Sequence, residues 1–202
     1  MKNPLSLFSK KKQPKLPVVI VSGLPRSGTS MMMKMLVEGG LQAVTDGLRQ
    51  ADNDNPNGYF ELEAVKEMTR GNLTWMDGAN GKVVKVISSL LEYLPPQHSY
   101  KIIFMERELS EVLASQQKML TNRNETSTVE DEEMKQQFQG HLKTVRAWLV
   151  RQPNIEVLYV NFNALMATPE PFCSRIVEFL GLPMNLEHML SVPNKNLYRN
   201  RS

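Results

Sequence analysis

The chain contains almost no cysteine, which limits its covalent and metal chemistry. Its 202 residues include only Cys173 and three histidines. One cysteine cannot form a disulfide within the chain, and it cannot supply the several thiolates of a structural zinc site. We therefore expect no disulfide scaffold and no bound metal. Cys173 lies in an apolar helical pattern, and we interpret it as a buried structural thiol.

The sequence also lacks a long apolar run. No stretch approaches the roughly 20 apolar residues that cross a bilayer, and residues 1–17 lack the apolar core of a secretory signal. We therefore expect no transmembrane segment and a cytoplasmic location. The hydrophobic fraction of 41% and the charged fraction of 22% are ordinary for a globular protein and exclude general disorder.

The chain also lacks a large excess of positive or negative charge, since its formal net charge is only +3. Part of this excess lies in an N-terminal run made of Lys10, Lys11, Lys12 and Lys15. Lysines without interleaved aromatic residues are usually solvated. We interpret residues 1–16 as a basic flexible tail and residues 17–202 as a single domain, with no nucleic-acid partner.

Apolar patterning predicts alternating strands and helices. Unbroken apolar, β-branched runs are typical of parallel strands covered on both faces, and they occur at 18–21, 83–87, 100–105 and 155–160. Helical spacing occurs at 31–37, 59–73, 109–120, 138–149 and 169–180.

The order of these segments predicts a three-layer α/β/α domain with a mostly parallel central sheet, like that of P-loop nucleoside triphosphatases. In such a fold the ligand lies at the carboxyl ends of the strands. Residues 42–58, rich in Asp, Asn, Gly and Pro, predict a surface loop. Residues 122–133 are either a mobile lid or the start of the next helix.

A glycine-rich loop joins the first predicted strand to the first predicted helix: Gly23-Leu24-Pro25-Arg26-Ser27-Gly28-Thr29-Ser30. Backbone N–H groups of such a loop surround a phosphate, and the helix N-terminus favours its negative charge. A nucleoside triphosphatase loop has Lys where this chain has Thr29, which argues against γ-phosphoryl transfer. Arg26 supplies positive charge instead, so the loop suits a terminal anion without magnesium.

Residues 25–30 resemble the 5′-phosphosulfate loop of sulfotransferases that use 3′-phosphoadenosine 5′-phosphosulfate (PAPS). The signature there is Pro-[Lys/Arg]-Ser-Gly-Thr-[Ser/Thr], and the likeness is to short members of bacterial type. The resemblance extends over residues 17–183, including the late segment Phe179-Leu180-Gly181-Leu182-Pro183. It implies that the cofactor-binding residues of the loop are Pro25, Arg26, Ser27, Gly28, Thr29 and Ser30.

The resemblance further implies an Arg and a Ser, eight positions apart after the third strand, that bind the 3′-phosphate. Arg107 and Ser115 match this pattern. Taken alone, Arg107 would be interpreted as half of a surface ion pair with Glu108 or Glu111, and Ser115 as an exposed helix residue. The occurrence of both signatures in the right order favours a nucleotide with two separate phosphate groups.

The activity implied is transfer of a sulfuryl group from PAPS to an acceptor hydroxyl, leaving adenosine 3′,5′-bisphosphate, without a metal. A base must take the hydroxyl proton. The small-molecule branch of the family carries a histidine in a Lys-Thr-His sequence on its second strand, but here the residues are Lys85-Val86-Ile87. We expect the three histidines to be structural: His98, His141 and His188.

Branches that act on proteins and glycans use a glutamate base, and Glu61 is our candidate here. Glu63, Asp46 and Asp52 are the alternatives. Arg26 and Lys85 are expected to contact the transferring group. Two other interpretations remain open: a small P-loop kinase or triphosphatase, and a nucleotide-binding module without catalysis. The sequence contains no pattern that predicts the class of acceptor or the oligomeric state.

Overall fold

The computed structural model describes residues 16–49, 52, 55, 58–125 and 129–193. A four-stranded sheet forms its centre, and its strands are β1 (Val18–Gly23), β2 (Val83–Lys85), β3 (Tyr100–Glu106) and β4 (Ile155–Asn161). Their order is β2-β1-β3-β4, and every pairing is parallel. This confirms the predicted parallel sheet and brings all four carboxyl ends to one edge.

The β1 strand is buried along its whole length and shares its side chains between two cores. Val19 and Val21 belong to one core, and Val18 and Ile20 belong to the other. Successive side chains of a strand point to opposite faces, so a strand covered on both faces needs an unbroken apolar run. The sequence 18–21 has that pattern.

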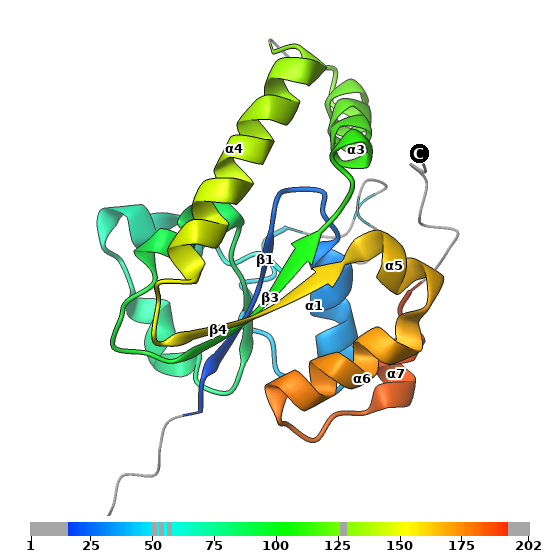
Figure 1. Cartoon of the computed structure of the whole chain (residues 1–202). Helices are drawn as coiled ribbons and strands as arrows, with labels where there is room; N and C mark the ends of the chain where they lie inside the picture. The colour runs from blue at the N-terminus through cyan, green and yellow to red at the C-terminus, as the bar shows by residue number, and fades with distance from the viewer. Residues whose placement is uncertain (1–15, 50–51, 53–54, 56–57, 126–128, 194–202) are drawn as a thin grey trace, which may run out of the picture.

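Helices cover each face of the sheet, which confirms the predicted three-layer architecture (Figure 1). The first core is closed by α1 (Thr29–Glu38), α5 (Phe162–Ala167), α6 (Pro169–Leu180) and α7 (Leu186–Leu190). The second is closed by α2 (Glu63–Lys66), three 3₁₀ helices and α4 (Asp131–Leu149). The 3₁₀ helices are η1 (Glu67–Arg70), η2 (Thr74–Gly78) and η3 (Ser88–Tyr93).

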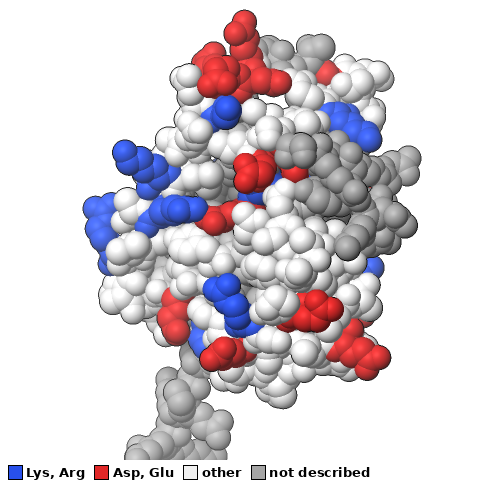
Figure 2. All heavy atoms as spheres, turned by 45° about the vertical axis from the view of Figure 1, so that its right-hand side comes forward, with Lys and Arg blue, Asp and Glu red and all other residues white. Residues whose placement is uncertain are grey.

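A hairpin of two helices, α3 (Leu109–Asn122) and α4, projects beyond the sheet (Figure 1). Both ends of the segment 122–133 are therefore helical. Acidic side chains gather at the hairpin tip (Figure 2), where residues 130–133 are exposed. None of the described helices combines the length and the apolar character of a membrane-spanning segment.

The helix predicted for residues 59–73 is wrong over most of its length. Residues 59–62 form no regular secondary structure, one helical turn follows in α2, and η1 continues as a 3₁₀ helix. Phe60 has a φ of 50°, and the Tyr59 carbonyl accepts a hydrogen bond from Lys85 instead of one within a helix. Tertiary contacts therefore override the local apolar spacing.

Cys173, expected to be a buried thiol, lies fully buried in α6, and burial raises its pKa to about 11. Residues 1–15 of the predicted basic tail lie outside the part of the chain that the structure describes. The division into a tail and one domain stays a prediction.

Candidate functional site

The loop between β1 and α1 leaves the N-terminus of α1 open to a cavity. Gly28 is the N-cap residue, no side chain caps this end of the helix, and the first turn carries no acidic residue. The positive end of the helix dipole and the first N–H groups are thus not compensated by the helix's own side chains. Gly28, Thr29 and Ser30 line the cavity. This arrangement fits a phosphate or sulfonate oxygen.

The loop is tightly wound and leaves no room for a side chain at Gly28. Arg26 and Gly28 adopt φ values of 69° and 97°, both in the left-handed region. A Cβ atom on Gly28 would overlap the ring of Phe162, which packs directly against the backbone. The Ser27 hydroxyl donates to the Leu24 carbonyl at 2.7 Å and closes the turn from within.

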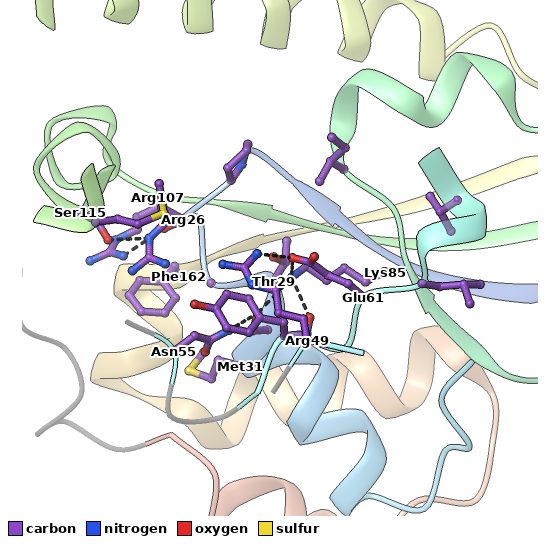
Figure 3. A pocket seen from close by; sticks show the side chains of 18 of the residues that line it. Arg26, Thr29, Met31, Arg49, Asn55, Glu61, Lys85, Arg107, Ser115 and Phe162 are labelled. Atoms are coloured by element: carbon purple, nitrogen blue, oxygen red, sulfur yellow. Dashed lines mark hydrogen bonds and ion pairs between the residues drawn. The ribbon is translucent and has the colours of Figure 1, made fainter. Parts of the chain in front are cut away.

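Arg26 and Arg107 join the two predicted phosphate signatures. Arg26 Nε donates to Ser115 Oγ at 2.9 Å, and Arg107 Nη1 donates to the Arg26 carbonyl at 3.1 Å. Figure 3 shows Arg26, Arg107 and Ser115 together, on the opposite side of Thr29 from Lys85 and Glu61. The structure thus brings together residues that the sequence separates by more than 80 positions.

A buried carboxylate holds Arg107. Arg107 Nε donates to Glu111 Oε2 at 2.8 Å, and Asn163 Nδ2 donates to Glu111 Oε1 at 2.8 Å. The side chain of Glu111 is only 2% exposed. The Arg107 guanidinium also lies over the Phe162 ring, 4.5 Å from its centre. These contacts fix the plane in which Arg107 presents its charge.

Lys85 and Glu61 occupy the other side of Thr29 (Figure 3). Lys85 Nζ donates to Ser30 Oγ at 3.1 Å and to the Tyr59 carbonyl at 2.9 Å, and it lies 3.9 Å from Glu61 Oε1. Burial lowers the pKa of Lys85 to about 8; the Glu61 carboxylate opposes this effect, and Arg49 and Arg26 add to it. Lys85 is therefore a cation that loses its proton easily.

The predicted surface loop contributes Arg49 and Asn55 to this end. Arg49 Nη1 lies 3.0 Å from Glu61 Oε1, and its guanidinium lies over the Tyr59 ring at 3.4 Å. Asn55 Nδ2 donates to Ser30 Oγ at 2.8 Å and to the Gly58 carbonyl at 2.7 Å. The composition of the loop predicted turns but gave no signal that these two side chains face the cavity.

One cavity of about 470 Å³ connects the two groups. It is lined by Pro25, Arg26, Gly28, Thr29 and Ser30 of the loop, by Arg107 and Ser115, and by Lys85 and Glu61. In the described part of the chain, no three His, Cys, Asp or Glu side chains gather as a metal site requires. The site can therefore offer cations and N–H groups to an anion with two charged ends.

Residues 82–186, just over half of the chain, match the model of the Sulfotransferase family. The chain belongs to the sulfotransferase family. The matched region contains Lys85, Arg107 and Ser115, and it begins after the glycine-rich loop and Glu61. No curated protein matches the chain in sequence.

Solved sulfotransferases share the fold of this one. The chain resembles sulfotransferase STF1 from Mycobacterium tuberculosis H37Rv with a TM-score of 0.56 and 13% identity, covering 89% of this chain and 70% of that one. The sulfotransferase domain from the curacin biosynthetic pathway gives 0.52 and 13%, with 89% and 78% covered. Mouse sulfotransferase SULT7A1, complexed with PAP, gives 0.54 and 10%, with 92% and 66% covered.

Among the four candidate carboxylates of this sulfotransferase, Glu61 alone lines the cavity. Asp46 accepts backbone N–H groups of residues 48 and 63, which lowers its pKa, and Asp52 accepts the Tyr59 hydroxyl at 2.7 Å. Glu63 pairs with Lys66 on the surface. None of the three histidines lines the cavity, and the His141 ring contacts Ser88 at 2.8 Å.

Sequence reasoning missed Glu111, Asn163 and Phe162. The sequence offered Glu111 only as an alternative to Glu108, in a surface ion pair of Arg107. The pair is instead buried, because Asn163 and the Phe162 ring from α5 cover it. The only sequence signal for this was a carboxylate one helical turn after a candidate phosphate-binding arginine.

Proposed function

We propose that the chain transfers the sulfuryl group of PAPS to an acceptor hydroxyl. The observation that carries this proposal is the single cavity with two cationic groups, Arg26 with Arg107 at one end and Lys85 at the other. If a nucleotide with phosphate groups at both its 3′ and 5′ positions is bound, each phosphate group has a cationic partner in the cavity. A nucleoside triphosphate carries its charge on one side of the ribose and gives Arg107 no role.

The donor is held at two places in this proposal. Arg107, Ser115 and Arg26 bind the 3′-phosphate, because these side chains meet at one end of the cavity. The sequence suggested Arg26 for the transferring group, but we now assign it to the 3′-phosphate because its side chain lies across Thr29 from Lys85 and Glu61. The 5′-phosphosulfate lies against the N-terminus of α1, where Pro25, Gly28, Thr29 and Ser30 line the wall. Ser27 shapes the loop through its bond to Leu24. PAP accompanies the fold relative SULT7A1 in its structure.

The chemistry takes place between Lys85 and Glu61. The acceptor oxygen forms a bond to sulfur, the bond from sulfur to the 5′-phosphate oxygen breaks, and the acceptor proton passes to the Glu61 carboxylate. Lys85 supplies positive charge beside the transferring sulfonate. Arg49 holds the Glu61 carboxylate within reach of Lys85. The products are a sulfate ester and adenosine 3′,5′-bisphosphate.

Ligand binding and turnover test this function. Calorimetry should show tight binding of adenosine 3′,5′-bisphosphate without magnesium, and much weaker binding of AMP and of ATP with magnesium. With radiolabelled PAPS and a panel of alcohols and phenols, Glu61→Gln should lower kcat at least 100-fold while bisphosphate affinity stays within twofold.

Three results would contradict the proposal in different ways. Magnesium-dependent ATP binding without bisphosphate binding would indicate a kinase. Tight bisphosphate binding with no transfer to any acceptor would indicate a module without catalysis. An unchanged kcat in Glu61→Gln would remove Glu61 as the base but leave the reaction standing.

A further inference from the structure

Beyond Lys85 and Glu61, the cavity is lined by four aliphatic side chains from two segments. Ile87 and Leu90 follow β2, and Leu62 and Val65 lie at the start of α2. Val65 belongs to the second core, and Leu62 and Leu90 pack against it. The adjoining η1 and η3 helices contact each other, which holds the two segments together. We name these four side chains the aliphatic wall.

Ile87 and Lys85 project to the same side of the chain. The backbone stays extended through Ile87, with φ −63° and ψ 151°, and the Val86 N–H donates to the Val21 carbonyl at 3.0 Å. Side chains alternate along an extended segment, so Val86 enters the core while Lys85 and Ile87 both face the cavity. An isoleucine that is 38% exposed thus lies beside the reacting centre.

The cations nearest the aliphatic wall already have partners. Arg49 pairs with Glu61 at 3.0 Å, and Lys66, next to Val65, pairs with Glu63 at 2.6 Å. Arg123, which also lines the cavity, lies exposed at the end of α3. A sugar or a polyanion placed on the wall would leave polar groups against Ile87 and Leu90 without hydrogen bonds, which is costly.

We propose that the acceptor hydroxyl is carried by an uncharged apolar group, such as an alkyl chain or a carbocyclic ring. The hydroxyl lies between Glu61 and Lys85, and the apolar part covers Ile87 and Leu90. Small-molecule sites combine apolar walls with a few polar groups in this way. The inference rests on the proposed sulfuryl transfer and names the class of its acceptor.

A series of straight primary alcohols from ethanol to 1-octanol tests the wall, with PAPS as donor. Each methylene buried on the wall should raise kcat/KM about fourfold until the wall is covered. Methyl glucoside, which also presents a primary hydroxyl, should fall at least tenfold below 1-hexanol. A flat series, or a preference for the glucoside, would overturn the inference and leave sulfuryl transfer standing.

Two matched variants locate the effect. Ile87→Asn should lower the increment per methylene to less than 1.5-fold. Leu186→Asn should keep it, since Leu186 has the same 38% exposure but lies in α7 and does not line the cavity. Both variants should bind adenosine 3′,5′-bisphosphate as the unchanged protein does, which shows that they are folded. Equal increments in both variants would remove Ile87 as the selecting residue.

Binding gives a readout that does not depend on turnover. In the complex with adenosine 3′,5′-bisphosphate, 1-hexanol should shift the ¹³C-methyl NMR signal of Ile87 and leave that of Ile155 in β4 unchanged. No shift at Ile87 with saturating 1-hexanol would overturn the inference. Failure of the bisphosphate itself to bind would instead overturn the proposed function.

Discussion

Arg26 Nε donates to Ser115 Oγ at 2.9 Å, although 89 positions separate the two residues. Together with the bond from Arg107 to the Arg26 carbonyl, this contact connects the glycine-rich loop to α3 and to the residues just before it. A phosphate bound here would accept hydrogen bonds from both guanidinium groups and from the Ser115 hydroxyl, and hydrogen bonds between ionised partners are among the strong ones. Nucleotide binding should therefore strengthen the connection between the loop and α3.

Arg107→Ala should weaken binding of adenosine 3′,5′-bisphosphate about 30-fold, because hydrogen bonds to charged groups contribute about 2 kcal/mol. Affinity for AMP, which lacks the 3′-phosphate, should change less than threefold. Calorimetry on the same preparation gives both values, so any change in folding affects the two ligands alike. The exposed Arg151→Ala serves as control. Equal losses for both ligands would refute the assignment of Arg107 to the 3′-phosphate.

Glu111→Gln should lower the free energy of unfolding by about 3 kcal/mol, since it leaves the buried Arg107 without its counter-charge. A bound 3′-phosphate would restore that counter-charge. Adenosine 3′,5′-bisphosphate should therefore raise the Tm of this variant more than that of the unchanged protein. Thermal unfolding with and without the ligand measures both effects, and the exposed Glu178→Gln should resemble the unchanged protein. Identical ligand-induced shifts in both proteins would show that Glu111 acts only in folding.

Affinity for adenosine 3′,5′-bisphosphate should fall as the pH rises through about 8. Burial lowers the pKa of Lys85 to about 8, so the side chain is an ammonium ion below this pH and a neutral amine above it. Only the ammonium form attracts the 5′-phosphate. Calorimetry from pH 7 to 9.5 should show this decline in affinity. Lys85→Met should abolish the decline, and Lys82→Met should retain it, because Lys82 does not line the cavity. A decline that persists in Lys85→Met would assign the titration to another group.

Gly28→Ala should lower the free energy of unfolding by about 1 to 3 kcal/mol and weaken nucleotide binding at least tenfold. The new methyl group would overlap the Phe162 ring, and the φ of 97° disfavours any side chain. Gly140→Ala provides the contrast, because Gly140 lies inside α4 with open space around it. This change should stabilise by about 0.5 to 1 kcal/mol. Denaturant titration compares the two, and a neutral Gly28→Ala would contradict the packing argument.

The strands and the glycine-rich loop were predictable because their signals are local. The unbroken run 18–21 indicates a strand covered on both faces, and the glycines that follow indicate a turn before a helix. The irregular path of residues 59–62 was not predictable in this way. It depends on the side chains of Lys85 and Arg49, which contact Tyr59 from outside this segment.

The same distinction applies to the candidate site. Arg107 and Ser115 were named because they match a second signature that the family resemblance implies, and the structure places both in one cavity. Glu111 escaped because its burial depends on Asn163 and Phe162, some 50 positions later. Arg49 was not predicted as a site residue, because composition indicates a loop but does not indicate which of its side chains face the cavity.

The strand order β2-β1-β3-β4 has a practical consequence for redesign. The proposed nucleotide-binding end of the cavity lies at the ends of β1 and β3, whereas the aliphatic wall follows β2, the outermost strand on that side. Residues 62–66 and 87–93 could thus be exchanged together, while Lys85, Glu61, the glycine-rich loop and α3 stay in place. Under the proposed function, a change of acceptor would then require no change in the residues that bind the donor.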